Sequence, residues 1–459
     1  MAAGKRAETA SSTRDADATT EIVFINAAHL LTHYALLILP TAVLAMARPG
    51  GAFGEEYGPV LALATGMFVL YGVGALPQGW LAERFGRRTM MTAFYLGTGL
   101  SLVLAGFVTT PAPLAVALAF AGAFSAIYHP IGTAMLIDAA GDRPGRSIGV
   151  NGVFGNLGVA LAPVVTALLA GAFGWRWAFL VPGLACLLVG AAWLRVPTVG
   201  RGGPRSSRPF PEIPPALVRR AVTVLLLIAA SSGLVFNAFT LLLPKLMEER
   251  LASDPALLPL VGGLAFAVTL CGALTQFTVG RLIDRMTLRR VLLPMSLVLA
   301  PALALAAFAR GWFVLPLAGL AAAVIFGQVT VNESMTARYI SPSLRARMYS
   351  VRFFVGFLGA AAAAPLVGFL HDRTGDLGLV MLVLSAFALT MVVCALIFPN
   401  RREELDPALW ARAPEACPPE TCPPEACPPA PPVAPISPER ALPEALEPLA
   451  PRPAAVPAE

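Results

Sequence analysis

Residues 79–88 read GWLAERFGRR and form a short basic segment between two long apolar runs. Residues 280–289 read GRLIDRMTLR and have the same layout, 201 positions further along the chain. In each copy an acidic residue, Glu83 or Asp284, stands four positions after the first glycine and directly before an arginine. Glycine lets two helices turn and pack closely, and a carboxylate at a helix end can pair with an arginine or a helix N-terminus. The repeat therefore predicts two related halves, each with a tight charged turn between long helices.

The composition of the whole chain points to a membrane. Apolar residues make up 57% of the 459 residues, and the mean hydropathy is +0.72. Charged residues make up 13%, about half of the ~25% found in soluble domains, so there is too little charge to cover soluble surfaces. This excludes a soluble multidomain protein, a disordered chain, a disulfide scaffold and a nucleic-acid binder, despite the net charge of +6.

Twelve segments are long and apolar enough to cross a bilayer as helices, for which ~20 residues are needed. They are too uniformly apolar for barrel strands, which alternate over ~10 residues. We expect the spans at 22–46, 57–78, 89–109, 113–137, 148–172, 176–195, 220–245, 257–279, 291–309, 313–337, 349–370 and 377–398. The predicted fold class is an all-α membrane protein with twelve transmembrane helices in two pseudo-symmetric six-helix bundles.

Charge and proline divide the chain into five regions. Arginines concentrate in alternate loops, and the positive-inside rule places these loops and both termini in the cytoplasm. A polar linker, residues 196–219, separates the bundles at 21–195 and 220–399. We expect residues 1–20 to be a disordered cytoplasmic tail, and the proline-rich residues 400–459 to be a second one.

The two charged turns and the twelve spans resemble the major facilitator superfamily, whose loop signature is G-x-L-a-D-r-x-G-r-r. The resemblance covers about residues 21–399. It implies that two bundles rock about a central site and that the charged turns form a conformational latch. The latch residues are Gly79, Glu83, Arg84, Gly86, Arg87, Asp284 and Arg285. Glu83 stands where the family usually has aspartate, and a basic loop that only sets the topology is the alternative.

Few polar side chains lie at membrane depth, where each is costly enough to be a functional candidate. His29 and His33 share one helix face because they are four residues apart. Pro130 follows His129 and frees a backbone carbonyl, which makes a bent, polar point in the fourth span. We expect a central cavity that binds the substrate or the coupling proton, with His33, Tyr34, His129, Asn156, Asn237, Asn332, Glu333 and Arg352 as its candidate residues.

Alternatives stay open for the titratable members of this set. The histidines could satisfy ordinary hydrogen bonds between helices, and no metal site is expected. Glu333 and Arg352 belong to neighbouring spans at similar depth, so we expect them to pair, because an isolated buried charge is prohibitive. Glu333 then either binds the coupling proton or gates the cytoplasmic side, or the pair is only structural.

The sequence contains no phosphate-binding loop, no HExxH motif, no nucleophile elbow and no Cys-x-x-Cys pair. We therefore predict neither ATP hydrolysis nor another enzymatic activity. No cofactor is expected, and a proton gradient would supply the energy. The expected partners are a small-molecule substrate and the lipid bilayer, without nucleic acid, and the protein is expected to be monomeric. Arginine far outnumbers lysine, as in GC-rich bacteria, which indicates the bacterial inner membrane.

A second resemblance concerns the branch of the superfamily. Residues 152–163, GVFGNLGVALAP, are similar to the glycine and proline signature of the antiporters, although that signature ends in Gly-Pro. HLLTHY at 29–34 and the Tyr128-His129-Pro130 sequence are similar to the fosmidomycin-resistance-type efflux branch. This implies proton-coupled efflux of a small organic compound by antiport. Uptake by symport is the alternative, and a non-transporting scaffold that uses the proline-rich tail is the remote one.

Overall fold

The structure is a computed structural model, which describes residues 2–140, 144–196, 213–251 and 255–405. Within these ranges every regular element is a helix. The chain divides into a helical unit, Met1–Ala411, and a second unit, Arg412–Glu459, which lies outside the described residues.

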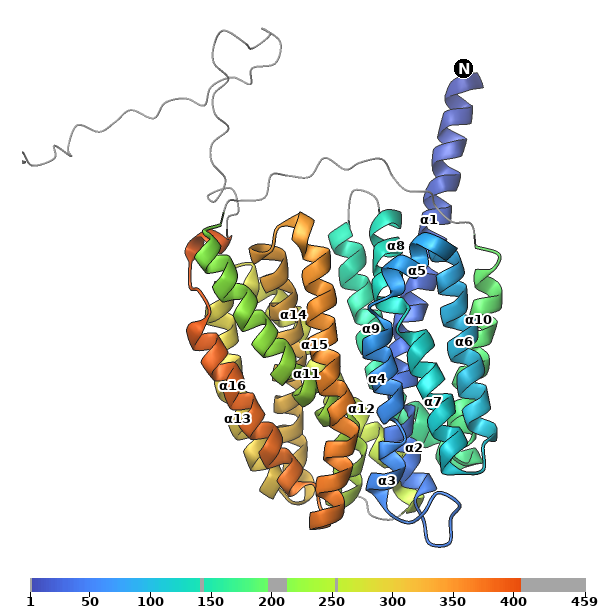
Figure 1. Ribbon diagram of the computed structural model, residues 1–459, viewed down its shortest axis with the longest axis vertical. Helices are drawn as coiled ribbons and strands as arrows, with labels where there is room; N and C mark the ends of the chain where they lie inside the picture. The colour runs from blue at the N-terminus through green and yellow to red at the C-terminus, as the bar shows by residue number, and fades with distance from the viewer. Residues whose placement is uncertain (1, 141–143, 197–212, 252–254, 406–459) are drawn as a thin grey trace, which may run out of the picture. The chain divides into compact units, whose positions relative to one another are not determined.

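The first half of the helical unit supplies the first six spans (Figure 1). Its helices are α1 (Ala2–Leu36), α2 (Ile38–Met46), α3 (Tyr57–Ala62), α4 (Thr65–Gly74), α5 (Gln78–Phe85), α6 (Arg87–Phe107), α7 (Pro111–Ser125), a π-helical turn (Tyr128–Gly132), α8 (Thr133–Ala139), α9 (Pro144–Phe173) and α10 (Trp177–Trp193). The first span is broken at Leu37, because Pro40 has no N–H to donate to the preceding turn.

The second half is more regular, and each span is one helix. They are α11 (Pro215–Leu251), α12 (Leu258–Ile283), α13 (Leu288–Phe308), α14 (Val314–Tyr339), α15 (Pro342–Thr374) and α16 (Gly378–Ile397), joined by short 3-10 turns at Pro255–Leu257 and Gly311–Phe313 and followed by one at Arg402–Leu405. Helix α15 ends at Gly375, whose φ of +74° is a left-handed conformation that suits glycine.

The predicted fold class is confirmed, and all but one of the predicted spans are long enough to cross a membrane. Among the described residues, 11 helical segments are long and apolar enough to cross a membrane. The remaining predicted span, near 176–195, is the shorter apolar helix Trp177–Trp193. At ~1.5 Å per residue its 17 residues measure about 25 Å, so this helix alone falls short of a ~30 Å hydrocarbon core.

The two halves meet along two sets of helices. Helix α9 packs against α12, while α3 and α4 pack against α15. A Cβ at Gly262 of α12 would lie 2.6 Å from the carbonyl oxygen of Pro163 on α9. A Cβ at Gly58 of α3 would lie 2.7 Å from the carbonyl oxygen of Gly368 on α15. Both distances are too short for any side chain, so glycine permits the close approach of the halves.

The structure differs from the sequence prediction at the N-terminus. Residues 2–20 were expected to be disordered but continue α1 as helix, because alanine-rich sequence extends a helix that the first span has already nucleated. Within the predicted linker, residues 197–212 lie outside the described residues, and its last residues begin α11. Residues 406–459 of the predicted C-terminal tail also lie outside the described residues.

Candidate functional site

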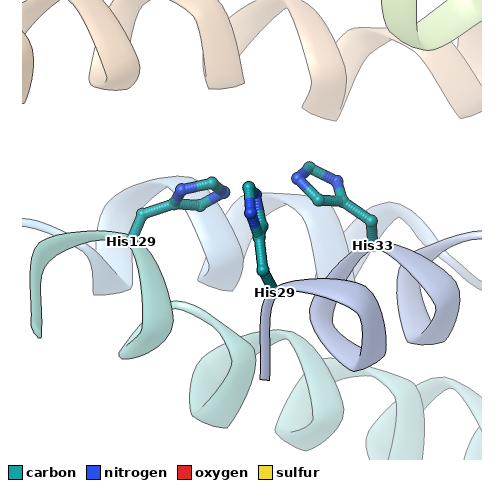
Figure 2. A group of neighbouring side chains, drawn as sticks. All are labelled: His29, His33 and His129. Atoms are coloured by element: carbon teal, nitrogen blue, oxygen red, sulfur yellow. The ribbon is translucent and has the colours of Figure 1, made fainter. Parts of the chain in front are cut away.

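Three of the four histidines of the chain come together inside the first half (Figure 2). His29 and His33 come from α1, and His129 comes from the π-helical turn before α8. The ring centroid of His29 is 5.0 Å from that of His33 and 5.4 Å from that of His129, and the rings of His33 and His129 are also 5.4 Å apart. One nitrogen from each ring lies within 4.8 Å of the others.

Helix α9 fixes the position of the His29 ring. His29 Nδ1 lies 2.7 Å from the backbone oxygen of Asn151, which can accept its hydrogen bond. Tyr128 stacks on the ring, with centroids 4.8 Å apart and planes at 22°. The side chain of Asn151 is itself held by Tyr128 and Asn26. Gly155 lies against the ring, and a Cβ there would be 2.5 Å from His29 Nε2.

The second half contacts this cluster through aromatic rings on α15. Phe353 stacks on His129, with centroids 5.4 Å apart and planes at 27°. Phe357, one turn further along α15, stands edge-on to Tyr71 of α4 at 4.6 Å. Tyr71 also lies edge-on to His129 at 6.1 Å. His129 of the first half is therefore in contact with an aromatic ring of the second half.

The expected pairing of Glu333 with Arg352 is confirmed. Arg352 of α15 donates to the carboxylate of Glu333 on α14. The arginine side chain is 9% exposed and the glutamate side chain 41% exposed, so the carboxylate is the accessible partner. The guanidinium also lies over the rings of Tyr349 and Phe353, 5.2 and 5.1 Å from their centroids. Phe353 thus connects this ion pair to His129.

The other predicted residues are not gathered at the histidines. Asn156 of α9 donates to the side-chain oxygen of Gln276 on α12, which bridges the two halves. Asn237 donates to the carbonyl of Gly233 in its own helix at 2.7 Å. Tyr34 is buried in the hydrophobic core. Asn332 is buried, and its side-chain oxygen has no hydrogen-bond partner within the described part of the chain.

A small pocket does lie between the halves, but at another place. It is lined by Leu37, Pro40, Thr41, Val159, Pro163, Thr240, Leu243, Pro244, Ala265 and Thr269. None of these 10 lining residues belongs to the predicted binding set. Pro40 of the first half and Pro244 of the second half both line this pocket.

The predicted latch is not closed in this conformation. Glu83, Arg84, Asp284 and Arg285 are all exposed, and the guanidinium of Arg84 only lies near the rings of its neighbours Trp80 and Phe85. Arg87 instead pairs with Asp138 at the end of α8, with Nη1 and Oδ2 2.6 Å apart. Gly86 follows the end of α5 with a φ of +83°. This positive φ favours glycine at the position, because residues with a Cβ rarely adopt it.

At the opposite end from the start of α1, α3 of the first half packs against α15 of the second half (Figure 1). The backbone N–H of Gly58 on α3 donates to Asp372 Oδ1 of α15 at 3.1 Å. Within the second half, His371 Nε2 lies 2.7 Å from Glu249 Oε1 of α11, which fixes the position of the His371 ring. The ring of Tyr57 meets His371 edge-on at 5.1 Å. This end of the interface is therefore closed.

Sequence reasoning missed Gln276, Asp138, Tyr71 and Phe353. Gln276 is a polar residue at membrane depth, and the rule that selected Asn156 applies to it equally. Asp138 follows the fourth span and could have been matched to the basic turn by charge alone. Nothing in the sequence marked Tyr71 and Phe353 as site residues, because aromatic side chains are common in apolar helices.

Two helical halves that meet around buried polar groups define a polytopic membrane protein of the two-bundle transporter class. The chain belongs to the Major Facilitator Superfamily, whose family model matches residues 30–274 and 225–438. The resemblance inferred from the two charged turns is thus confirmed. Members of this superfamily are transporters, not enzymes, and generally need no cofactor.

The names of individual relatives point to different transported compounds. A multidrug resistance protein B homolog of Mycobacterium tuberculosis is 31% identical over 147 residues, 30% of this chain and 26% of that protein. The 4-hydroxybenzoate transporter PcaK of Acinetobacter baylyi is 29% identical over 147 residues, 32% of this chain and 31% of that protein. The chain thus spans less than half the length of the curated relatives that it matches.

A solved structure matches much more of the chain. The bacterial homolog of the human lysosomal transporter Spinster, in an inward-facing and occupied conformation, covers 83% of this chain and 96% of its own, with a TM-score of 0.66. At 14% sequence identity, this likeness establishes the fold alone.

Proposed function

We propose that this protein is a proton-coupled secondary transporter that exports a small organic compound by alternating access. The observation that carries the proposal is the contact between His129 of the first half and Phe353 of the second, next to the Glu333–Arg352 pair. A group of titratable and aromatic side chains spans the junction of two bundles that must separate and rejoin during transport. A substrate that binds there can bias the motion of the halves.

In this proposal Glu333 takes the coupling proton. The Glu333 side chain is 41% exposed and the Arg352 side chain 9%, so a proton can reach the Glu333 carboxylate while the Arg352 guanidinium stays buried. Protonation of Glu333 would leave Arg352 unpaired and free to hold an anionic or polar group of the substrate. His33, His129, Asn332 and Asn156 remain candidates for substrate contact.

The direction of transport rests on two supports. The glycines of α9 resemble the antiporter signature, and Gly155 and Gly158 each bring α9 against α1. Among the relatives, the multidrug resistance protein B homolog favours export. We extend this to the fosmidomycin-resistance-type branch, to the bacterial inner membrane with both termini in the cytoplasm, and to a monomer. Uptake by symport is the second candidate, favoured by the 4-hydroxybenzoate transporter relative.

The conformational state also fits a transport cycle. We assign the closed end, with the Gly58–Asp372 contact, to the outside of the membrane, and the open latch to the cytoplasm. Glu83 and Asp284 would then find partners only when the cytoplasmic ends of the halves come together. The pairing of Arg87 with Asp138 keeps the turn in place meanwhile.

The test uses the full chain in proteoliposomes with a pH-sensitive dye and a panel of organic compounds. Antiport predicts that an exported compound drives protons in the opposite direction, whereas movement in the same direction would establish symport. His129→Ala should abolish the flux while the protein still inserts and folds, and wild-type flux in that variant would remove the site. Removing residues 406–459 should leave flux intact, whereas a scaffold would lose its activity.

A further inference from the structure

We propose that His29, His33 and His129 form a binding site for one divalent first-row transition-metal ion, such as Zn²⁺ or Co²⁺. This goes beyond the proposed function, and it revises the expectation from sequence, which placed no metal here. The sequence showed two histidines on one helix face and a third a hundred residues away; only the fold brings their nitrogens within 4.8 Å of one another.

The geometry is close to that of a tetrahedral site. Zinc–nitrogen bonds of ~2.0–2.1 Å place two tetrahedral ligands about 3.4 Å apart. The three nitrogens therefore need to approach each other by roughly 1.4 Å at most, which small rotations of the histidine side chains supply. The three ring centroids form a nearly equilateral triangle with sides of 5.0, 5.4 and 5.4 Å, so the three rings surround one point (Figure 2).

The surroundings prepare the cluster for coordination. A metal-binding histidine typically donates its other N–H to a carbonyl, which fixes the tautomer and the ring orientation. His29 has this arrangement, because Nδ1 faces the backbone oxygen of Asn151 at 2.7 Å and leaves Nε2 for a ligand. His129 stands in a π-helical turn, a distortion that is frequent at functional sites. Neither His33 nor His129 has a ring hydrogen bond among the described residues that would compete for its nitrogens.

The donor set selects the class of ion. Imidazole suits zinc, cobalt, nickel and copper, whereas calcium and magnesium prefer oxygen ligands. Three protein ligands leave a fourth position for water or for an anionic group. All three rings are half-buried, so the ion is partly shielded and still accessible.

The experiment measures binding to the full chain, purified without a histidine tag in lipid nanodiscs. CoCl₂ should give the visible absorption of a tetrahedral Co²⁺ ion at one equivalent per chain, and ZnCl₂ should displace it. His33→Ala and His129→Ala should each weaken Zn²⁺ binding by more than about 100-fold, since even the loss of an outer partner of a ligand costs ~10–100-fold.

Two controls decide where a bound ion sits. His371→Ala removes the remaining histidine, which lies at the closed end of the interface, and should bind as the wild type does. Replacing Cys417, Cys422 and Cys427 with serine removes the tail thiols and should also leave binding intact. The proposal is overturned if the wild type shows no tetrahedral spectrum, if the spectrum survives loss of His33 and His129, or if it is lost with the cysteines. Because this readout needs no transport, it stands or falls separately from the proposed function.

Discussion

Gly155→Ala tests whether the position of the His29 ring matters. A Cβ at residue 155 would lie 2.5 Å from both Cε1 and Nε2 of His29, whereas carbon atoms pack best at ~3.5–4.0 Å. The ring must therefore move by about 1 Å or more, and Nε2 moves with it, which changes its distances to His33 and His129. The perturbation is small in volume and acts on one ring.

The magnitude follows from two opposing effects. Overpacking at this contact costs about 1–3 kcal/mol, while alanine in place of glycine in a helix gains about 0.5–1 kcal/mol. We expect a net destabilisation of about 0–2.5 kcal/mol, visible as a small fall in the thermal midpoint in nanodiscs. We expect a larger effect on function, with transport reduced and Zn²⁺ affinity lowered by about 10–100-fold.

Gly152→Ala is the matched control, one turn earlier on α9. A Cβ at Gly152 meets no atom within 4 Å, so this variant gains the helix propensity without disturbing a neighbour. Its stability should rise slightly, and its transport and metal affinity should equal those of the wild type. If Gly155→Ala and Gly152→Ala behave alike in both assays, the reasoning about His29 is refuted.

Three further predictions concern other contacts. Gly58→Ala should destabilise the closed end of the interface by about 1–3 kcal/mol and so raise the population of the open state about 5–150-fold. Cysteine labelling at that end measures the open population, and unchanged labelling would contradict the prediction. Asp138→Asn removes a half-exposed pair with Arg87 worth ~0.2–1 kcal/mol, so it should slow transport without shifting the thermal midpoint appreciably; equal rates would show the pair to be inert. Glu404 accepts hydrogen bonds from Leu288 N–H and the Tyr339 hydroxyl, and burial raises the pKa of its carboxyl group. The folded state therefore binds the carboxyl proton more tightly than the unfolded state does. The stability that comes from this difference is lost as the pH rises through the raised pKa. Relative to Glu404→Gln, the wild type should therefore lose thermal stability as the pH rises above the ordinary pKa range of a glutamate, and parallel profiles would disprove the assignment.

Much of the fold could be predicted because its signals are local. Apolar runs such as 291–309 are long enough to span a bilayer whatever they pack against, and lipid forces them to be helical. The repeated turns at 79–88 and 280–289 indicated two related halves and a resemblance to the Major Facilitator Superfamily. The match to the family model confirmed that the chain belongs to this superfamily. The break at Leu37 and the helix over residues 2–20 were missed, since helix continuity depends on how neighbouring turns propagate.

The candidate site was predicted only in part. Polar residues at membrane depth are rare enough to be found from sequence, which is why His33, His129 and Glu333 were named. Which of them meet could not be found in this way, because sequence spacing fixes neighbours within one helix but not across helices. Asn156 has its partner in Gln276 of the other half, while Asn237 bonds within its own helix.

The sequence by itself determined that this chain crosses the membrane many times in two related halves, because hydrophobicity and loop charge act on each segment separately. Only the tertiary structure decided that three imidazoles share one place and that Phe353 connects them to an ion pair. Those contacts depend on helix packing, and close packing here depends on glycines such as Gly155, where a single methyl group would move a histidine ring.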